Sequence, residues 1–83
     1  GQRQAFAVTV KHIVELEGIY GISHLHICRD ADDNVIIYKG TQYWENGAQV
    51  TFMAKVKEHG VRDGVKQTII QRPTKVKING EDY

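Results

Sequence analysis

The 83-residue chain contains one cysteine, one proline and no apolar run approaching the ~20 residues that a membrane-spanning helix requires. A single cysteine, Cys28, excludes an internal disulfide and suits a reducing compartment such as a bacterial cytoplasm. No secretory signal is visible, and the chain opens with GQRQAF in place of a methionine. We therefore expect a cytoplasmic protein without membrane contact, either a trimmed chain or a domain excised from a longer protein.

Sequence motifs of the common enzyme classes are also missing. The chain has no serine-centred nucleophile elbow, no phosphate-binding P-loop and no HExxH pair of metal-binding histidines. Cys28 and a nearby histidine can be drawn as a catalytic dyad, but no third group is evident to orient the base. We expect no enzymatic activity and no cofactor.

The net charge of +1 conceals an uneven distribution of charge along the chain. Between Lys55 and Lys77 there are seven lysines and arginines but two carboxylates, so this segment carries +5. The remainder has four cations and eight carboxylates and carries −4. Such a division indicates a polyanionic partner more strongly than the charge of the whole chain does.

Alternation of apolar and polar residues is the dominant pattern, and it predicts five strands. In the first, AFAVTVKHIVELEG, the even positions from Phe6 to Leu16 form the apolar face, with His12 as the one exception. The other four are expected in SHLHICRD, NVIIYKG, QVTFMAKVKEH and VKQTIIQRPTKVKI. Pro73 limits central pairing of the last strand. The first few residues and residues 79–83 are expected to fray.

The stretch DADDN is typical of a hairpin turn between the second and third strands. A three-residue loop from Ala31 to Asp33 pairs Asp30 with Asn34, and it requires a left-handed backbone at Asp33. This register predicts a core face made of Leu25, Ile27, Val35 and Ile37. The predicted outer face consists of His24, His26, Cys28, Ile36 and Tyr38.

Five strands without a repeat or an amphipathic helix fit a small closed barrel, because closure removes the open edges of a sheet. The expected fold is all-β: one five-stranded domain resembling the oligonucleotide/oligosaccharide-binding (OB) barrel. Residues 41–48 are too few for the substantial helix that OB barrels place between strands three and four. An SH3-like barrel is the alternative.

The stretches LHICRDADDNVIIYKG and GAQVTFMAKVKEHGVRDGVKQTIIQRP resemble a pattern of phage and plasmid proteins of DNA replication and recombination. The resemblance covers roughly residues 20–75, and its more specific parts are VKEH at 56–59 and GVKQT at 64–68. It implies an OB-like module appended to a larger protein that acts in DNA metabolism in a bacterial host. The chain departs from the pattern at Asp33, where the pattern favours glycine.

Cationic side chains around the predicted final hairpin are the first candidates for contact with nucleic acid. Several cations along a track suit the phosphates of a strand, and binding of this kind weakens with salt. The alternative is a solvated sheet face, since exposed lysine also discourages edge-to-edge association. The candidate phosphate contacts are Lys55, Lys57, Arg62, Lys66 and Arg72, and His59 and Gln67 add hydrogen-bonding groups.

Aromatic side chains on which bases can stack are the second group of candidates. Tyr20 lies in the first loop, Tyr38 on the predicted outer face of the third strand, and Tyr43 and Trp44 in the following loop. Trp44 is an equally good candidate for the barrel core. All four border the surface that OB barrels use for ligands.

The histidines of HLHIC form a third group. His24 and His26 are predicted surface groups that stack on a strand or hydrogen-bond to it, with plain exposure as the alternative. Together with Cys28 they provide too few ligands for zinc, and we expect no metal. The sequence thus predicts a module for nucleic acid, single-stranded DNA in particular, with little sequence preference. The alternative is a protein-interaction barrel that docks a replication or recombination enzyme through an acidic surface of that partner.

Overall fold

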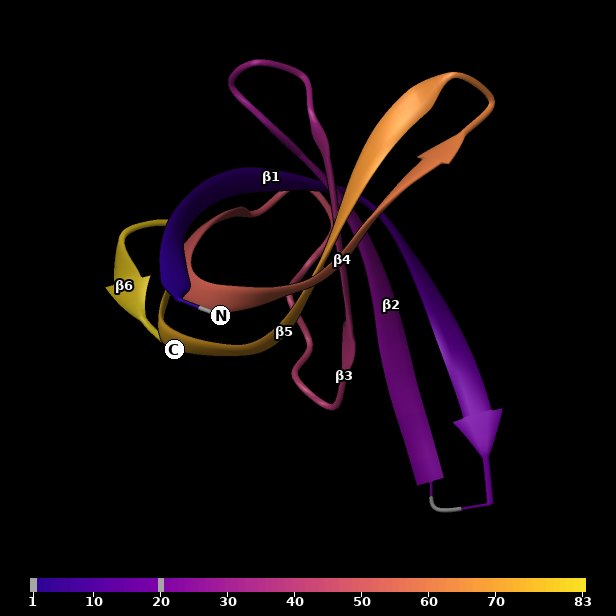
Figure 1. Cartoon of the computed structure of the whole chain (residues 1–83). Coiled ribbons are helices and arrows are strands. Elements are labelled where there is room, and N and C mark those ends of the chain that lie inside the picture. Colours follow the sequence, from indigo (N-terminus) through magenta and orange to yellow (C-terminus); the bar gives the residue numbers. More distant parts are fainter. Residues whose placement is uncertain (1, 20) are drawn as a thin grey trace.

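The fold is described from a computed structural model of the chain, which describes residues 2–19 and 21–83 (Figure 1). Its strands are β1 (Arg3–Gly18), β2 (Gly21–Asp30), β3 (Val35–Gly40), β4 (Gln49–Arg62), β5 (Val65–Ile78) and β6 (Glu81–Asp82). The described residues contain no helix. Tyr20, one of the predicted stacking residues, lies outside the described residues.

The sheet closes on itself in the order β1–β2–β3–β5–β4–β1. All pairs in this ring are antiparallel except β3 and β5, which run parallel. Closure depends on the long, curved β1, whose first part pairs with β4 and whose later part pairs with β2 (Figure 1). The chain is therefore an all-β, five-stranded OB-like barrel, as predicted, and β3 connects to β4 without a helix.

A β-bulge at Lys11 reverses the facing of β1 part-way along the strand. The pairing with β2 keeps one register up to Val10 and takes another from His12, so Lys11 is the extra residue. Beyond the bulge Ile13 packs against the core, whereas His12 is exposed. The predicted even-numbered apolar face is thus wrong after Val10, because one inserted residue inverts the alternation.

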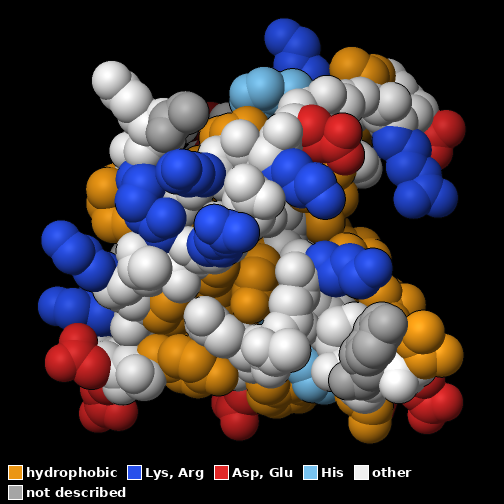
Figure 2. Space-filling view, turned by 60° about the horizontal axis from the view of Figure 1, so that its bottom comes forward, with side chains coloured by type: hydrophobic (Ala, Val, Ile, Leu, Met, Phe, Trp, Pro, Cys, Tyr) orange, Lys and Arg blue, Asp and Glu red, His pale blue; other side chains and the backbone are white. Residues whose placement is uncertain are grey.

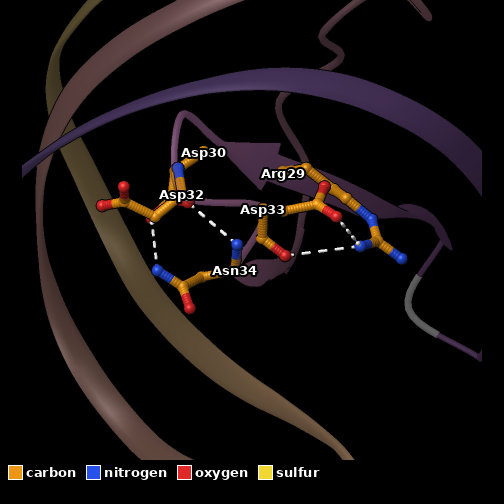
Figure 3. Close-up of polar contacts among 5 residues, drawn as sticks. All are labelled: Arg29, Asp30, Asp32, Asp33 and Asn34. Atoms are coloured by element: carbon orange, nitrogen blue, oxygen red, sulfur yellow. Dashed lines mark hydrogen bonds and ion pairs between the residues drawn. The ribbon is translucent and has the colours of Figure 1, made fainter.

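The β2–β3 turn has the predicted conformation (Figure 3). The backbone N–H of Asp30 donates to the carbonyl of Asn34 at 3.1 Å, and Asp33 is left-handed with φ 65°. The Asp30 carboxylate accepts from the backbone N–H groups of Asp32 (3.0 Å) and Asn34 (2.9 Å) and from the Asn34 side-chain amide (3.1 Å). Partial burial raises the pKa of Asp30, but these hydrogen bonds outweigh it and lower the pKa below its usual value.

The predicted register of β2 against β3 is confirmed, but the predicted facing is wrong except at Val35, which is buried as predicted. Cys28 is opposite Ile36 and His26 is opposite Tyr38, as expected, yet all four side chains are buried. The half-buried residues of the outer face are Leu25, Ile27 and Ile37. Both faces carry apolar residues, so alternation alone does not decide which one turns inward. The barrel accommodates His26 because its ring nitrogens have hydrogen-bond partners inside.

The core contains a continuous run of aromatic rings. Phe6 stacks on Phe52 at 5.3 Å, Phe52 contacts Trp44 at 5.1 Å, and Trp44 stacks on Tyr38 at 4.6 Å between ring centroids. Tyr38 in turn stacks on His26 at 5.2 Å. The buried aliphatic residues around these rings include Val8, Val10, Ile36, Val50, Ala54 and Ile70. Rings of this size supply much of the buried apolar area that so small a barrel needs.

The C-terminal residues, which the sequence predicted to fray, pair as a hairpin in the structure. Asn79 and Gly80 form the turn with φ of 53° and 84°, and β6 pairs with the end of β5. The Asn79 side chain accepts from the backbone N–H of Gln49 at 3.0 Å, and the N–H of Tyr83 donates to the carbonyl of Val76 at 3.0 Å. Asn-Gly is a strong signal for a two-residue hairpin turn, and its presence at 79–80 accounts for this order.

Candidate nucleic-acid interface

Cationic side chains gather on the outer surface of β4, β5 and the first part of β1. Figure 2 shows a group of Lys and Arg side chains at the left of the view, with further ones at the top and on the right. Strand pairing identifies the rows: Arg3 is opposite Lys55, and Thr51 is opposite Lys77. We call this surface the cationic face, and its cations are Arg3, Lys55, Lys57, Arg72, Lys75 and Lys77.

Alternation along β4 explains why these side chains point outward. Val50, Phe52 and Ala54 are buried inside the barrel, as predicted. Because successive residues of a strand point to opposite faces, Thr51 and Lys55 point to the outside. The adjoining part of β5 is irregular around the buried Pro73, where the pairing with β4 shifts register. Arg72 and Lys75 have φ of 54° and 52° on either side of it.

The guanidinium of Arg3 reaches across β4. Its Nη2 atom donates to the carbonyl of Met53 at 3.0 Å, to Oγ1 of Thr74 at 2.9 Å and to the carbonyl of Arg72. These contacts hold a positive charge directly across from Lys55. Like charges in this position repel one another across adjacent strands. An anion bound between the two side chains would relieve that repulsion.

No cation of the cationic face forms an ion pair among the described residues, although Asp82 is opposite Lys77 in the pairing of β5 with β6. Among residues 2–19 and 21–83 the one ion pair is Arg29–Asp33 in the β2–β3 turn, with 3.1 Å between Nη1 and Oδ2. An open depression of about 460 Å³ lies on the face, bordered by Lys75 and Lys77. Its surface includes the small side chains of Ala5 and Ala7, so an extended ligand can approach the sheet closely there.

A second concave surface lies at the end of the barrel where the β4–β5 hairpin and the β2–β3 turn project together (Figure 1). It has a volume of about 680 Å³, and we call it the mouth groove. Its apolar floor is formed by Phe6, Ile36 and Val56. Its polar lining includes Gln4, Asp30, Asn34, His59, Lys66, Gln67 and Thr68.

The structure divides the predicted cationic and polar residues between these two surfaces. Lys55, Lys57 and Arg72 belong to the cationic face, whereas His59, Lys66 and Gln67 line the mouth groove. Arg62 is opposite Val65 at the tip of the β4–β5 hairpin. The prediction of one continuous track through all of them is wrong, because pairing shifts register between Val56 and Glu58 and changes the facing beyond it.

Three of the predicted surface rings are inside the barrel. Tyr38 is 5% exposed, and Trp44 and His26 are fully buried. The prediction that Tyr38 and His26 are surface groups is therefore wrong, whereas for Trp44 the alternative of a place in the core is confirmed. Tyr43 is half-exposed at 50%, and its backbone N–H donates to the Tyr83 hydroxyl at 3.3 Å.

His24 lies beside this exposed tyrosine. Its ring, in a half-buried side chain, has its centroid 5.1 Å from that of Tyr43 in an edge-on arrangement. Tyr43 and His24 thus remain accessible members of the predicted set, and Tyr83 joins them with 61% exposure.

The side chains of His26 and Cys28 are buried, and burial favours the uncharged form of each. Nε2 of His26 accepts from the backbone N–H of Trp44 at 3.0 Å, and Nδ1 lies 3.2 Å from the carbonyl of Tyr38, to which it donates. Burial lowers the pKa of His26, and burial raises the pKa of the Cys28 thiol to about 12. In the part of the chain that the structure describes, no three His, Cys, Asp or Glu side chains converge to hold a metal ion.

Comparisons with protein-family models, curated proteins and solved structures find no match. The resemblance to phage and plasmid proteins stays a prediction. No helix within the described residues is long and apolar enough to cross a membrane.

The outer face of β2 and β3, which OB barrels commonly use for ligands, carries aliphatic side chains. Leu25, Ile27 and Ile37 form it together with Ile69 of β5, which is opposite Ile37. Aliphatic side chains offer no ring for base stacking. The cations and the aliphatic face thus occupy different parts of the barrel surface.

Sequence reasoning missed four residues of these surfaces as binding candidates: Arg3, Lys75, Lys77 and Tyr83. Lys75 and Lys77 flank Val76, which packs against the core, so their alternation was a usable signal. Arg3 is in phase with the outward odd positions of β1. The Asn-Gly turn that orders Tyr83 was also readable from the sequence.

Proposed function

We propose that the protein is a nucleic-acid-binding module that holds a single strand, DNA above all, by its phosphates on the cationic face. The observation that carries the proposal is the gathering of six cations there, none of which forms an ion pair among the described residues. The resemblance noted above adds the setting, which is DNA metabolism of a phage or another mobile element.

Phosphate contacts of this kind give affinity but little sequence preference, because every nucleotide offers the same phosphate. Tyr43, with its half-exposed ring, is the stacking residue of the proposal. Base stacking on an aromatic ring contributes ~1–3 kcal/mol per base and tolerates any sequence.

The test is the salt dependence of binding of a fluorescently labelled oligonucleotide, followed by anisotropy. If the face contacts about five phosphates of a single strand, the affinity should fall roughly 100-fold between ~50 and ~200 mM salt. Lys55→Glu together with Lys77→Glu should abolish binding. The matched control, Lys11→Glu together with Lys39→Glu, changes the same number of charges on exposed residues outside the face and should retain most of the affinity. Absence of binding at low salt would contradict the proposal.

The second candidate function is docking of a replication or recombination enzyme with an acidic surface. The observation in its favour is the aliphatic outer face of Leu25, Ile27, Ile37 and Ile69, which is suited to burial against a protein and has Lys39 opposite Leu25. Ile37→Asp should abolish this docking while leaving oligonucleotide binding intact. The first function is supported if oligonucleotide binding is lost in the Lys55→Glu, Lys77→Glu double variant and is retained in Ile37→Asp.

A further inference from the structure

We propose that the mouth groove accepts one unstacked base of the strand that the cationic face holds. This inference rests on the proposed function and names a second contact surface for the same ligand. The groove lies outside the β2–β3 face, and none of its lining cations belongs to the cationic face.

The groove has the size and composition of a site for a small planar group. Its volume of about 680 Å³ falls within the ~300–1,000 Å³ typical of small-ligand pockets, which combine an apolar lining with a few polar groups. Phe6 supplies an aromatic ring that is partly exposed, backed by Phe52 at 5.3 Å. Ile36 and Val56 complete a floor without charge. A base packed on Phe6 would gain a stacking contact of the kind single-strand binders use.

One wall of the groove is held in place by the β2–β3 turn. The Asn34 side-chain nitrogen donates to the Asp30 carboxylate at 3.1 Å, so the amide is oriented and its carbonyl oxygen is left as an acceptor (Figure 3). The Asp30 carboxylate is itself fixed by three donors from Asp32 and Asn34. An acceptor on a rigid turn can receive the exocyclic amino group or ring N–H of a base.

The opposite wall belongs to the β4–β5 hairpin and offers donors. His59 and Thr68 lie opposite each other, with Nδ1 and Oγ1 3.5 Å apart, and Lys66 is two residue pairs further toward the tip. The amide of Gln67 lines the same space. Lys66 supplies the positive charge that the phosphate of an inserted nucleotide requires.

The groove is continuous with the cationic face around the free edge of β1. Pairing of β1 with β2 begins only at Val8, so the preceding residues have β4 on one side alone. Successive residues of a strand point to opposite faces, which places Arg3 on the cationic face and Gln4 in the groove. A strand held by Arg3 and Lys55 therefore passes this edge and can turn one base inward.

The experiment compares a short oligonucleotide with the same strand carrying abasic sites, for the native chain and two variants. Phe6→Leu removes the ring from the groove but keeps an apolar side chain of similar bulk. Phe52→Leu, the matched control, removes the neighbouring ring of the same stack, which is buried and does not line the groove. The native chain should bind the complete strand ~5- to 100-fold more tightly than the abasic one. Phe6→Leu should lower this ratio and leave only the part that stacking on Tyr43 contributes, whereas Phe52→Leu should preserve the native ratio.

The outcomes separate this inference from the proposed function. Equal binding of both strands by the native chain would overturn the inference and leave phosphate binding by the cationic face standing. A ratio that Phe6→Leu leaves unchanged would also overturn it, because the bases would then be contacted only outside the groove, for example at Tyr43. Binding of neither strand at low salt would overturn the proposed function itself. NMR titration provides a second measurement. The backbone amide signals of Gln67 and Thr68 should shift when the complete strand is added but not when the abasic strand is added. The amide signal of Lys77 should shift with either strand.

Discussion

The ring of His26 links two parts of the chain by accepting a hydrogen bond at Nε2 from the backbone N–H of Trp44, 3.0 Å away. Because Nδ1 donates to the carbonyl of Tyr38, the ring is the neutral tautomer. Protonation would replace the acceptor with a donor facing the Trp44 N–H. The contact thus connects the charge state of one histidine to the anchoring of the β3–β4 connection.

Stability should consequently fall in mild acid. Burial lowers the folded-state pKa of His26 from 6.5, with the neighbouring His24 adding a smaller effect in the same direction. The unfolded chain therefore binds the proton more readily, so the contribution of neutral His26 is complete above pH ~6.5 and is lost as the pH falls toward the lower folded pKa. Urea unfolding at pH 7.5, 6.5 and 5.5 measures this loss.

Substitution of His26 identifies the group responsible. His26→Gln should flatten the pH dependence between 7.5 and 5.5 and cost ~1–3 kcal/mol at pH 7.5, because the Trp44 N–H loses a well-placed acceptor. The exposed His12 provides the control: His12→Gln should preserve the native pH dependence. A His26→Gln variant that retains the native slope would contradict this assignment.

Gly40 should tolerate no side chain, since a Cβ atom at this position would overlap the hydroxyl and ring of Tyr38. Gly40→Ala must then displace a ring that stacks on both Trp44 and His26. We expect a loss of ~1–3 kcal/mol in the free energy of unfolding, as for other overpacked cores. Gly60→Ala is the control, because a Cβ there meets open space at an ordinary φ. Equal stabilities of the two variants in urea would contradict the packing around Tyr38.

The strands and the β2–β3 turn were predictable because their signals are local. Asp30 and Asn34 pair as the DADDN stretch predicts, and Asp33 takes the left-handed conformation expected of it. The facing of β2 and β3 was not predictable in the same way. Ile36 and Ile37 are equally apolar, and His26 is acceptable in the core only because Trp44, far along the chain, donates to it. Such a partner cannot be read from the alternation of one strand.

The candidate site was predicted in part, for a similar reason. The excess of cations from Lys55 to Lys77 was evident from composition, but its division between two surfaces follows from a register shift next to Val56. Tyr38 was predicted to stack bases, and Trp44 either to stack bases or to lie in the core, yet a barrel of this size uses both large rings to fill the core. Composition thus identified the charge, and only the pairing of strands located it.

Arg3 should serve both the barrel and its ligand, and Arg3→Lys separates the two roles. Lysine keeps the charge on the cationic face, but its ammonium lies on a different side-chain geometry from Nη2, the single nitrogen that contacts both Met53 and Thr74. We expect oligonucleotide affinity within ~3-fold of native and a stability loss of ~1 kcal/mol from the weakened hydrogen bonds. Arg3→Gln should lower the affinity as well, with a smaller salt dependence. Equal affinities for the lysine and glutamine variants would exclude Arg3 as a phosphate contact.

Trp44 provides a direct check on where bases bind, because it is the single tryptophan of the chain and is fully buried. Its emission should be that of an indole shielded from water, and iodide should quench it weakly until urea unfolds the barrel. Saturation with oligonucleotide should leave the emission unchanged, since no base can reach a ring enclosed by Tyr38, His26 and Phe52.

Tyr43→Ala, in contrast, should weaken binding ~5-fold or more with little effect on the unfolding curve, because its ring is half-exposed. Strong quenching of Trp44 by the oligonucleotide would show that the strand opens the core, and the stacking role would then return to the buried rings.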